Sequence, residues 1–233
     1  MNLEPRTLCI DVGGTGLKMQ IVGSDGVAIG ERVKVPTPRT ASPEEFLGTL
    51  MGMIEVQGEI ERISVGFPGV VVEGVTLTAP HLDERWHGFG FGAELARLTG
   101  KPVRVANDAD VQGYGDIEGV GLELVRTLGT GVGSAAYIEG KLVPNLELGH
   151  APYRGSKTYE DYLNDEVLKD IGPKKWRKRV SKVVEQIEPI WNYRVLYLGG
   201  GNSRLLKTED LPTNVTISPN SAGLTGGIRL WAD

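Results

Sequence analysis

The sequence is poor in several features that would indicate particular protein classes. Cys9 is the one cysteine among 233 residues, which excludes an internal disulfide and a cysteine-rich zinc site. It lies in an apolar segment, so a small buried core residue is a better interpretation than a nucleophile. No run of about 18 apolar residues occurs, so we expect no membrane span. The formal net charge of −5 argues against a general binder of nucleic acids or anionic membranes, because both need a basic surface.

The N-terminal segment has neither the basic region nor the apolar region of a secretory signal. We therefore expect a cytoplasmic enzyme or binding protein. Glycine, in contrast, is abundant: the chain has 33 glycines, about twice the average share. They cluster at the ends of predicted strands, which indicates many tight turns and close approaches of a ligand to the backbone.

A glycine-rich turn near the N-terminus interrupts two apolar segments. Asp11 stands at the end of the first segment, residues 8–12, and the turn Gly13-Gly14-Thr15-Gly16 leads into the second, residues 17–22. This pattern predicts a strand, a glycine hairpin and a second strand. Backbone N–H groups that converge in such a turn suit a phosphate. An acid at the end of the strand could hold the metal ion that accompanies the phosphate.

The same order of elements returns in the second half of the chain, where Gly129-Thr130-Gly131-Val132-Gly133 separates two predicted strands. Strands alternate with helices in both halves, which predicts α/β layers, and two glycine turns that face each other would form a cleft. The predicted strands are residues 27–35, 60–67, 102–106, 125–128, 135–138, 141–143, 193–198 and 215–218, and the predicted helices are 43–57, 93–98, 107–117, 159–191 and 222–231.

Two common phosphate-binding motifs do not fit these turns. A Walker A loop needs G-x-x-x-x-G-K-[ST], but Gly16 is followed by Leu17, and the pair Gly140-Lys141 lacks the rest of the motif. A dinucleotide fingerprint needs G-x-G-x-x-G between a strand and a helix. The turn 129–133 has a different spacing and leads into a predicted strand, so neither motif is supported.

Taken together, the motifs resemble the ROK (repressor, ORF, kinase) family of sugar kinases, and within it most closely the polyphosphate glucokinases. The resemblance implies an α/β, two-lobed actin/hexokinase-like (ribonuclease H-like) fold with a central cleft. It divides the chain into an N-terminal lobe, residues 1–117, and a C-terminal lobe, residues 118–233, whose last helix is a candidate to pack back on the first lobe. The segments that carry the resemblance, in the family's order, are 10–18, 66–70, 107–110, 127–133, 147–150 and 199–202.

The resemblance implies a set of residues for the phosphoryl donor, which would be polyphosphate or ATP. The two glycine turns would hold the donor phosphates, and Asp11 would lie near Mg²⁺, through water. The segment 200–202 would lie against the nucleoside or against more of a phosphate chain. The residues implied for the donor are Asp11, Gly13, Gly14, Thr15, Gly16, Lys18, Gly129, Thr130, Gly131, Gly133, Gly200, Gly201 and Asn202.

The implied acceptor is a hexose, preferentially glucose phosphorylated at its 6-hydroxyl. Asn107, Glu147 and His150 would bind sugar hydroxyls, and Asp108 would be the general base on the attacking hydroxyl. Asp110 is better explained as a first-turn acid of the same helix. Each of these residues also has a structural interpretation, since Asn107-Asp108 is a good helix N-cap by residue type.

Some features depart from the family pattern. Many members follow Gly-His with a cysteine-rich zinc loop and a further sugar-binding glutamate, but residues 151–158 contain no cysteine. We therefore expect neither zinc nor a counterpart of that glutamate. His81 stands where members commonly have asparagine. A kinase for another hexose or an amino sugar, or a non-catalytic sugar sensor, remains an alternative. A DNA-binding repressor is not expected, because the first strand begins within about eight residues of Met1. A homodimer is the family's habit.

A basic segment follows in the long predicted helix. Its simplest interpretation is the solvated face of that helix, opposite the apolar positions of Trp176 and Val180. The alternative is a binding surface for a polyanion such as polyphosphate. Its basic residues are Lys174, Lys175, Arg177, Lys178, Arg179 and Lys182.

Overall fold

The computed structural model describes residues 5–38, 40–80, 82–219 and 222–232. These residues fall into two compact units, which are described separately. Unit 1 takes in the described residues of the ranges 1–115 and 221–233, and unit 2 takes in those of the range 116–220.

Unit 1 is built on a five-stranded sheet with the strand order β3-β2-β1-β4-β7. The first three strands form an antiparallel meander, and β4 and β7 then add parallel to β1. The strands of the sheet are β1 (Thr7–Val12), β2 (Gly16–Val22), β3 (Ala28–Pro36), β4 (Arg62–Phe67) and β7 (Val103–Asn107). A separate small hairpin, β5 (Val71–Val72) and β6 (Val75–Thr76), follows β4 and precedes the 3₁₀ segment η1 (Glu84–Trp86).

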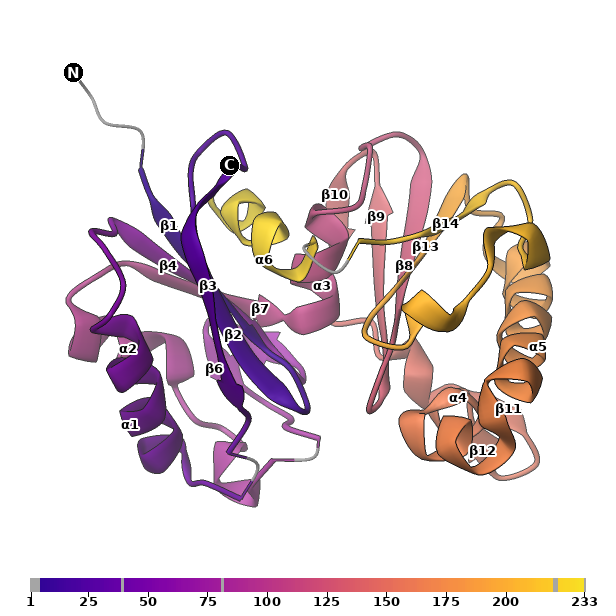
Figure 1. Cartoon of the computed structure of the whole chain (residues 1–233), viewed down its shortest axis with the longest axis horizontal. Coiled ribbons are helices and arrows are strands. Elements are labelled where there is room, and N and C mark those ends of the chain that lie inside the picture. Colours follow the sequence, from indigo (N-terminus) through magenta and orange to yellow (C-terminus); the bar gives the residue numbers. More distant parts are fainter. Residues whose placement is uncertain (1–4, 39, 81, 220–221, 233) are drawn as a thin grey trace. The chain divides into compact units, whose positions relative to one another are not determined.

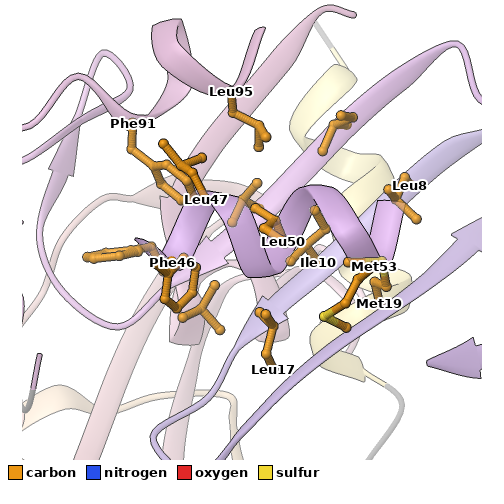
Figure 2. Packing of buried hydrophobic residues seen from close by; sticks show 14 of the residues in the cluster. Leu8, Ile10, Leu17, Met19, Phe46, Leu47, Leu50, Met53, Phe91 and Leu95 are labelled. Atoms are coloured by element: carbon orange, nitrogen blue, oxygen red, sulfur yellow. The ribbon is translucent and has the colours of Figure 1, made fainter. Parts of the chain in front are cut away.

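Helices cover both faces of this sheet (Figure 1). Helices α1 (Pro43–Ile54) and α2 (Phe91–Thr99) lie on one face, and α3 (Asp108–Tyr114) and α6 (Ala222–Thr225) lie on the other. Ser42 caps α1 in a reciprocal capping box with Glu45, and Pro43 occupies the first turn, as the sequence predicts. Leu8, Ile10 and Phe46 belong to the apolar core between the sheet and the helices α1 and α2 (Figure 2).

The C-terminal segment completes unit 1. Short helix α6 is followed by the 3₁₀ segment η5 (Gly226–Trp231), where the sequence predicts one continuous helix. Ser64 on β4 donates a hydrogen bond to the carbonyl of Gly227, at 2.7 Å, and accepts one from the indole N–H of Trp231, at 2.8 Å. The guanidinium groups of Arg62 and Arg104 both stack on the Trp231 ring. These contacts fix the end of the chain on the sheet.

Unit 2 repeats the sheet of unit 1, with the strand order β10-β9-β8-β13-β14. Three antiparallel strands are again followed by two parallel ones. The strands are β8 (Leu122–Leu128), β9 (Val132–Ile138), β10 (Lys141–Val143), β13 (Val195–Gly199) and β14 (Val215–Ile217). The repeat of pattern in the sequence is therefore a repeat of sheet topology in the structure.

The helices of unit 2 are α4 (Glu160–Leu163) and the long α5 (Asp165–Trp191), which packs on one face of the sheet (Figure 1). Gly172 interrupts α5 with φ 75° just before Pro173, which accounts for a kink at this point. Beyond the kink, Trp176 and Val180 face the core, as their spacing predicts. A hairpin of β11 (Pro152–Arg154) and β12 (Lys157–Thr158) and the 3₁₀ segments η2 (Leu148–His150), η3 (Ser203–Leu205) and η4 (Thr208–Asp210) were not predicted.

Candidate active site

The first glycine turn closes the hairpin between β1 and β2. The N–H of Gly13 donates to the carbonyl of Gly16, at 3.2 Å, and the hydroxyl of Thr37 donates to the carbonyl of Gly13. Asp11 lies opposite Lys18 in the antiparallel register. The Lys18 ammonium lies 2.7 Å from an Asp11 carboxylate oxygen, and both side chains are largely buried. Lys18, a predicted phosphate ligand, is thus held in an ion pair.

A second lysine lies directly over this turn. Lys34 on β3 is the register partner of Lys18, and its side chain packs against Gly16. A Cβ at Gly16 would lie 2.7 Å from the Lys34 Cε, so glycine leaves the room that the lysine occupies. Among the described residues, no carboxylate lies within ion-pair distance of Lys34. The turn therefore has an uncompensated cation that the sequence analysis did not identify, because it comes from the third strand.

The predicted base, Asp108, is the first residue of α3 and directly follows β7. Asn107 caps this helix: its Oδ1 accepts from the N–H of Ala109, at 2.8 Å, and from that of Asp110, at 3.3 Å. Its Nδ2 donates to the carbonyl of Gly69, at 3.1 Å. Asn107 is buried and Asp108 is half-buried. The structural interpretation of Asn107 as an N-cap is therefore confirmed, and this cap fixes the helix start that carries Asp108.

The register brings Asp11 and Asp108 to the same edge of the sheet. Asp11 pairs with Gly66 on β4, and Gly66 pairs with Ala106 on β7, two residues before Asp108. Parallel neighbours end at the same edge, and adjacent strands lie about 4.8 Å apart. A Cβ at Gly66 would lie 3.3 Å from the Asp108 Cα, so Gly66 allows α3 to begin close to the sheet. The first turn, the predicted metal-side acid Asp11 and the predicted base Asp108 thus belong to one edge of unit 1.

The second glycine turn joins β8 and β9 in unit 2. The N–H of Gly129 donates to the carbonyl of Gly131, at 3.0 Å, and the N–H of Gly133 donates to the Thr127 hydroxyl, at 3.1 Å. A Cβ at Gly129 would meet no atom within 4 Å, so this side of the turn is open. Gly131 is closely covered, since a Cβ there would lie 2.6 Å from a carboxylate oxygen of Glu160.

Glu160, at the start of α4, was not predicted as a site residue. Its carboxylate accepts a hydrogen bond from the N–H of Val132, at 2.8 Å, directly behind the second turn. It also lies close enough to raise the pKa of Glu147. Residues 151–158 contain no cysteine, so no counterpart of the family's further glutamate was expected after Gly-His. Glu160 lies two residues beyond this segment, after the hairpin β11–β12.

Glu147 directly precedes the short segment η2, and His150 is its last residue. The Nε2 of His150 lies 3.8 Å from a Glu147 carboxylate oxygen. Burial raises the pKa of Glu147, and His150 opposes this shift. A Cβ at Gly149 would lie 2.1 Å from the carbonyl oxygen of Val132, so glycine is needed for η2 to pack on the second turn. Glu147 and His150, two of the three predicted sugar-binding residues, therefore lie beside the same turn as Glu160.

The segment 200–202 lies next to the second turn, since Gly199 is the register partner of Thr127. Gly200 has φ 82°, and a Cβ there would lie 2.5 Å from the Leu128 carbonyl oxygen. The N–H of Asn202 donates to that same carbonyl, at 2.9 Å, and its buried side chain donates to Asp165, at 3.4 Å. The Asn202 amide is therefore used within the protein. A Cβ at Gly201 would meet no atom within 4 Å, so open space borders this glycine.

Metal-binding clusters and membrane-spanning helices are both absent from the described residues. They contain no group of three or more His, Cys, Asp or Glu side chains that could hold a metal ion. In the same part of the chain, no helix has the length and apolar character needed to cross a membrane. His81, singled out in the sequence, lies outside the described residues.

Comparison with known proteins gives consistent matches across the chain. The signature of the ROK family matches residues 7–159. The polyphosphate glucokinase of Mycobacterium tuberculosis is 36% identical over 93% of this chain and 88% of its own length. The crystal structure of the inorganic polyphosphate/ATP-glucomannokinase from Arthrobacter sp. strain KM matches with a TM-score of 0.85 and 31% identity, over 96% of this chain and 97% of that chain.

A third match concerns the fold alone. The ROK family glucokinase from Streptomyces griseus, solved in complex with glucose and AMPPNP, has a TM-score of 0.79 at 20% identity, over 97% of this chain and 98% of that chain. With the repeated five-stranded sheets, these matches confirm the predicted α/β fold of the actin/hexokinase (ribonuclease H-like) type. The chain belongs to the ROK family.

Proposed function

We propose that the protein is a sugar kinase that transfers a phosphoryl group from polyphosphate or ATP to the 6-hydroxyl of a hexose, preferentially glucose. The observation that carries the proposal is the edge of unit 1, where the first glycine turn, Asp11 and Asp108 occur together. Asp108 supplies a carboxylate directly after the edge strand β7, and the turn supplies backbone N–H groups. The similarity to polyphosphate glucokinase supports the assignment of donor and acceptor.

In the proposed reaction, the base, the donor phosphates and the charged groups around them each have one role. The oxygen of the sugar hydroxyl attacks the terminal phosphorus of the donor, and Asp108 accepts the proton of that hydroxyl. The bond from that phosphorus to the bridging oxygen breaks, and ADP or a polyphosphate shorter by one phosphate leaves. Most of the catalytic effect comes from positioning and from compensation of charge, for which the chain offers the two glycine turns and the ammonium of Lys34.

The proposed ligands of the acceptor sugar are polar side chains near Asp108 and polar side chains beside the second turn. Glu147 and Glu160 can accept hydrogen bonds from sugar hydroxyls, and His150 can donate or accept. Asn107 caps α3 and donates to Gly69, and in this proposal it also lies against the sugar at the start of that helix. Glu160 joins the residues predicted from the sequence as a fourth sugar-binding residue.

The residues present fit Mg²⁺ in the way that phosphotransferases commonly hold it. Mg²⁺ keeps several waters and is held by one or two carboxylates together with substrate phosphates, rather than by a complete protein cage. Asp11 is a single carboxylate at the end of β1, beside the first turn. It would hold the ion through water, and the ion would neutralise charge on the donor phosphates. The ion pair with Lys18 keeps this carboxylate oriented.

The test is an assay of wild type and Asp108→Asn with polyphosphate and with ATP against a panel of hexoses and N-acetylated amino sugars, in which sugar phosphate is measured directly. Wild type should phosphorylate glucose, and the variant should lose about 10²–10⁴-fold in kcat while keeping its thermal stability. Near-normal turnover of the variant would remove the base assignment. Absence of sugar phosphate from every pair would favour the non-catalytic sensor.

The finer properties belong to the same proposal. A cytoplasmic location would place the enzyme with its donors, and its product would enter glycolysis. A homodimer follows the habit of the family. Light scattering coupled to size-exclusion chromatography measures this directly, and a mass of about 25 kDa would show a monomer.

A further inference from the structure

The basic residues of α5 separate into two groups in the structure. Arg177 donates to the carbonyl of Leu205, at 3.4 Å. The guanidinium of Arg179 stacks 4.3 Å from the centre of the Tyr162 ring and donates to the Tyr162 carbonyl, at 3.2 Å. Both arginines are half-buried and hold α5 against neighbouring segments. They therefore have a structural role that their neighbours in the sequence do not share.

The lysines behave differently. Lys174, Lys178 and Lys182 are exposed and follow one another at intervals of four residues, which places them on one face of the helix. At about 1.5 Å per residue, this lysine row extends about 12 Å along α5. Among the described residues, no carboxylate lies within ion-pair distance of the three. The nearest acids in sequence on this side, Asp170 and Glu185, lie beyond the two ends of the row.

The segment 202–205 and helix α5, which are in contact, each carry an arginine between Asn202 and the lysine row. Arg204 is exposed in η3, two residues after Asn202, and Leu205 is the next residue. The carbonyl of Leu205 accepts from Arg177, which precedes Lys178 on α5. Asp210 lies 3.9 Å from Arg177 and compensates part of that charge. The cations beyond it, on the lysine row, are not compensated.

We infer that the lysine row of α5 binds the distal part of a long polyphosphate chain whose end is held at the glycine turns. The inference rests on the proposed function. A linear polyanion with a negative charge on every phosphate can reach beyond the reaction site, whereas the short phosphate tail of ATP ends there. Uncompensated lysines at helical spacing gain more from such a chain than from a single phosphate, because each contact releases counterions. The net charge of −5 makes a nucleic acid the less suitable polyanion.

The test compares wild type with the triple variant Lys174→Gln, Lys178→Gln, Lys182→Gln. A control variant changes Lys101, Lys141 and Lys157 to Gln and so has the same net charge. KM and kcat are measured with ATP, tripolyphosphate and long-chain polyphosphate at several salt concentrations. The row variant should raise KM for long-chain polyphosphate about tenfold and flatten its salt dependence by about two in log–log slope, at about 0.7 for each lost contact. The KM for ATP and tripolyphosphate should not change.

Equal KM increases for all three donors, or equal effects of the control variant, would overturn the inference. Equilibrium binding of long-chain polyphosphate without sugar separates this inference from the proposed function. Wild type could bind long-chain polyphosphate more tightly than the row variant and yet form no sugar phosphate in the kinase assay. That result would support the lysine row as a polyphosphate site and would refute the kinase assignment. If both proteins bind it equally, the row is only a solvated helix face.

Discussion

Replacement of Asn107 tests the link between the fold and the proposed base. Its side chain makes two kinds of contact: Oδ1 accepts from two N–H groups of the first turn of α3, and Nδ2 donates to the carbonyl of Gly69. The residue is 6% exposed, so water cannot easily replace either contact. Alanine removes both contacts. Serine keeps an oxygen for the cap but has no group that reaches Gly69.

The magnitudes follow from these contacts. Loss of an N-cap costs about 1 kcal/mol, and the carbonyl of Gly69, left without its donor, costs about another 1 kcal/mol. Asn107→Ala should therefore lower the free energy of unfolding by about 2 kcal/mol, and Asn107→Ser by about 1 kcal/mol. For a chain of this size the corresponding shifts in Tm are about 4–8 °C and about 2–4 °C.

Differential scanning calorimetry measures both variants, and kinetics with glucose separates the two roles of the residue. If Asn107 also binds the sugar, the serine variant should raise KM for the hexose at a temperature where it is fully folded. Equal destabilisation by serine and alanine would refute the capping argument. A shift of less than about 1 °C for alanine would refute both structural contributions.

Three further predictions address other parts of the site. Lys34→Gln should raise the donor KM about fivefold, corresponding to about 1 kcal/mol, while Arg32→Gln on the same exposed strand should have no effect. Burial raises the pKa of Glu147 above its ordinary 4.5, so the folded state holds this proton more tightly. Thermal stability should therefore fall as the pH rises from about 4.5 through the raised pKa, and Glu147→Gln should remove this contribution in a series of melting curves. Gly200→Ala should destabilise by at least about 2 kcal/mol, because its Cβ would lie 2.5 Å from a backbone oxygen. Gly201→Ala, with open space around its Cβ, should keep the wild-type Tm.

Much of the architecture could be predicted because the decisive signals are local. The cap Ser42 and the following Pro43 predict the start of α1, and the structure begins the helix there. The end of α1 was predicted at Gln57 but lies at Ile54. The prediction was too long because the sequence has no strong stop signal before Gly58. The two glycine turns and their flanking strands were predicted from apolar segments interrupted by glycines, and the sheet topology confirmed that the pattern repeats.

The residues that the sequence analysis missed reach the site through tertiary structure. Lys34 is 18 positions from Gly16 along the chain and reaches it only because β3 pairs with β2. Glu160 reaches the second turn because the hairpin β11–β12 returns the chain to it. Neither contact produces a periodic or motif signal. Conversely, Lys18 has the position of a phosphate ligand in the sequence, but the register places it opposite Asp11, which binds its ammonium.

The abundance of glycine has a steric explanation at the second turn. Side chains at Gly131, Gly149 and Gly200 would overlap atoms of Glu160, Val132 and Leu128. Three segments that are distant in sequence can therefore converge on one turn, because the residue at each contact is a glycine without a Cβ. They are the start of α4, the η2 segment and the end of β13. This packing places the carboxylates of Glu147 and Glu160 next to backbone that also has an open side at Gly129. The proposed phosphate and sugar contacts of unit 2 would therefore share one closely packed corner, so a larger residue at any of these three glycines should weaken both donor and acceptor binding.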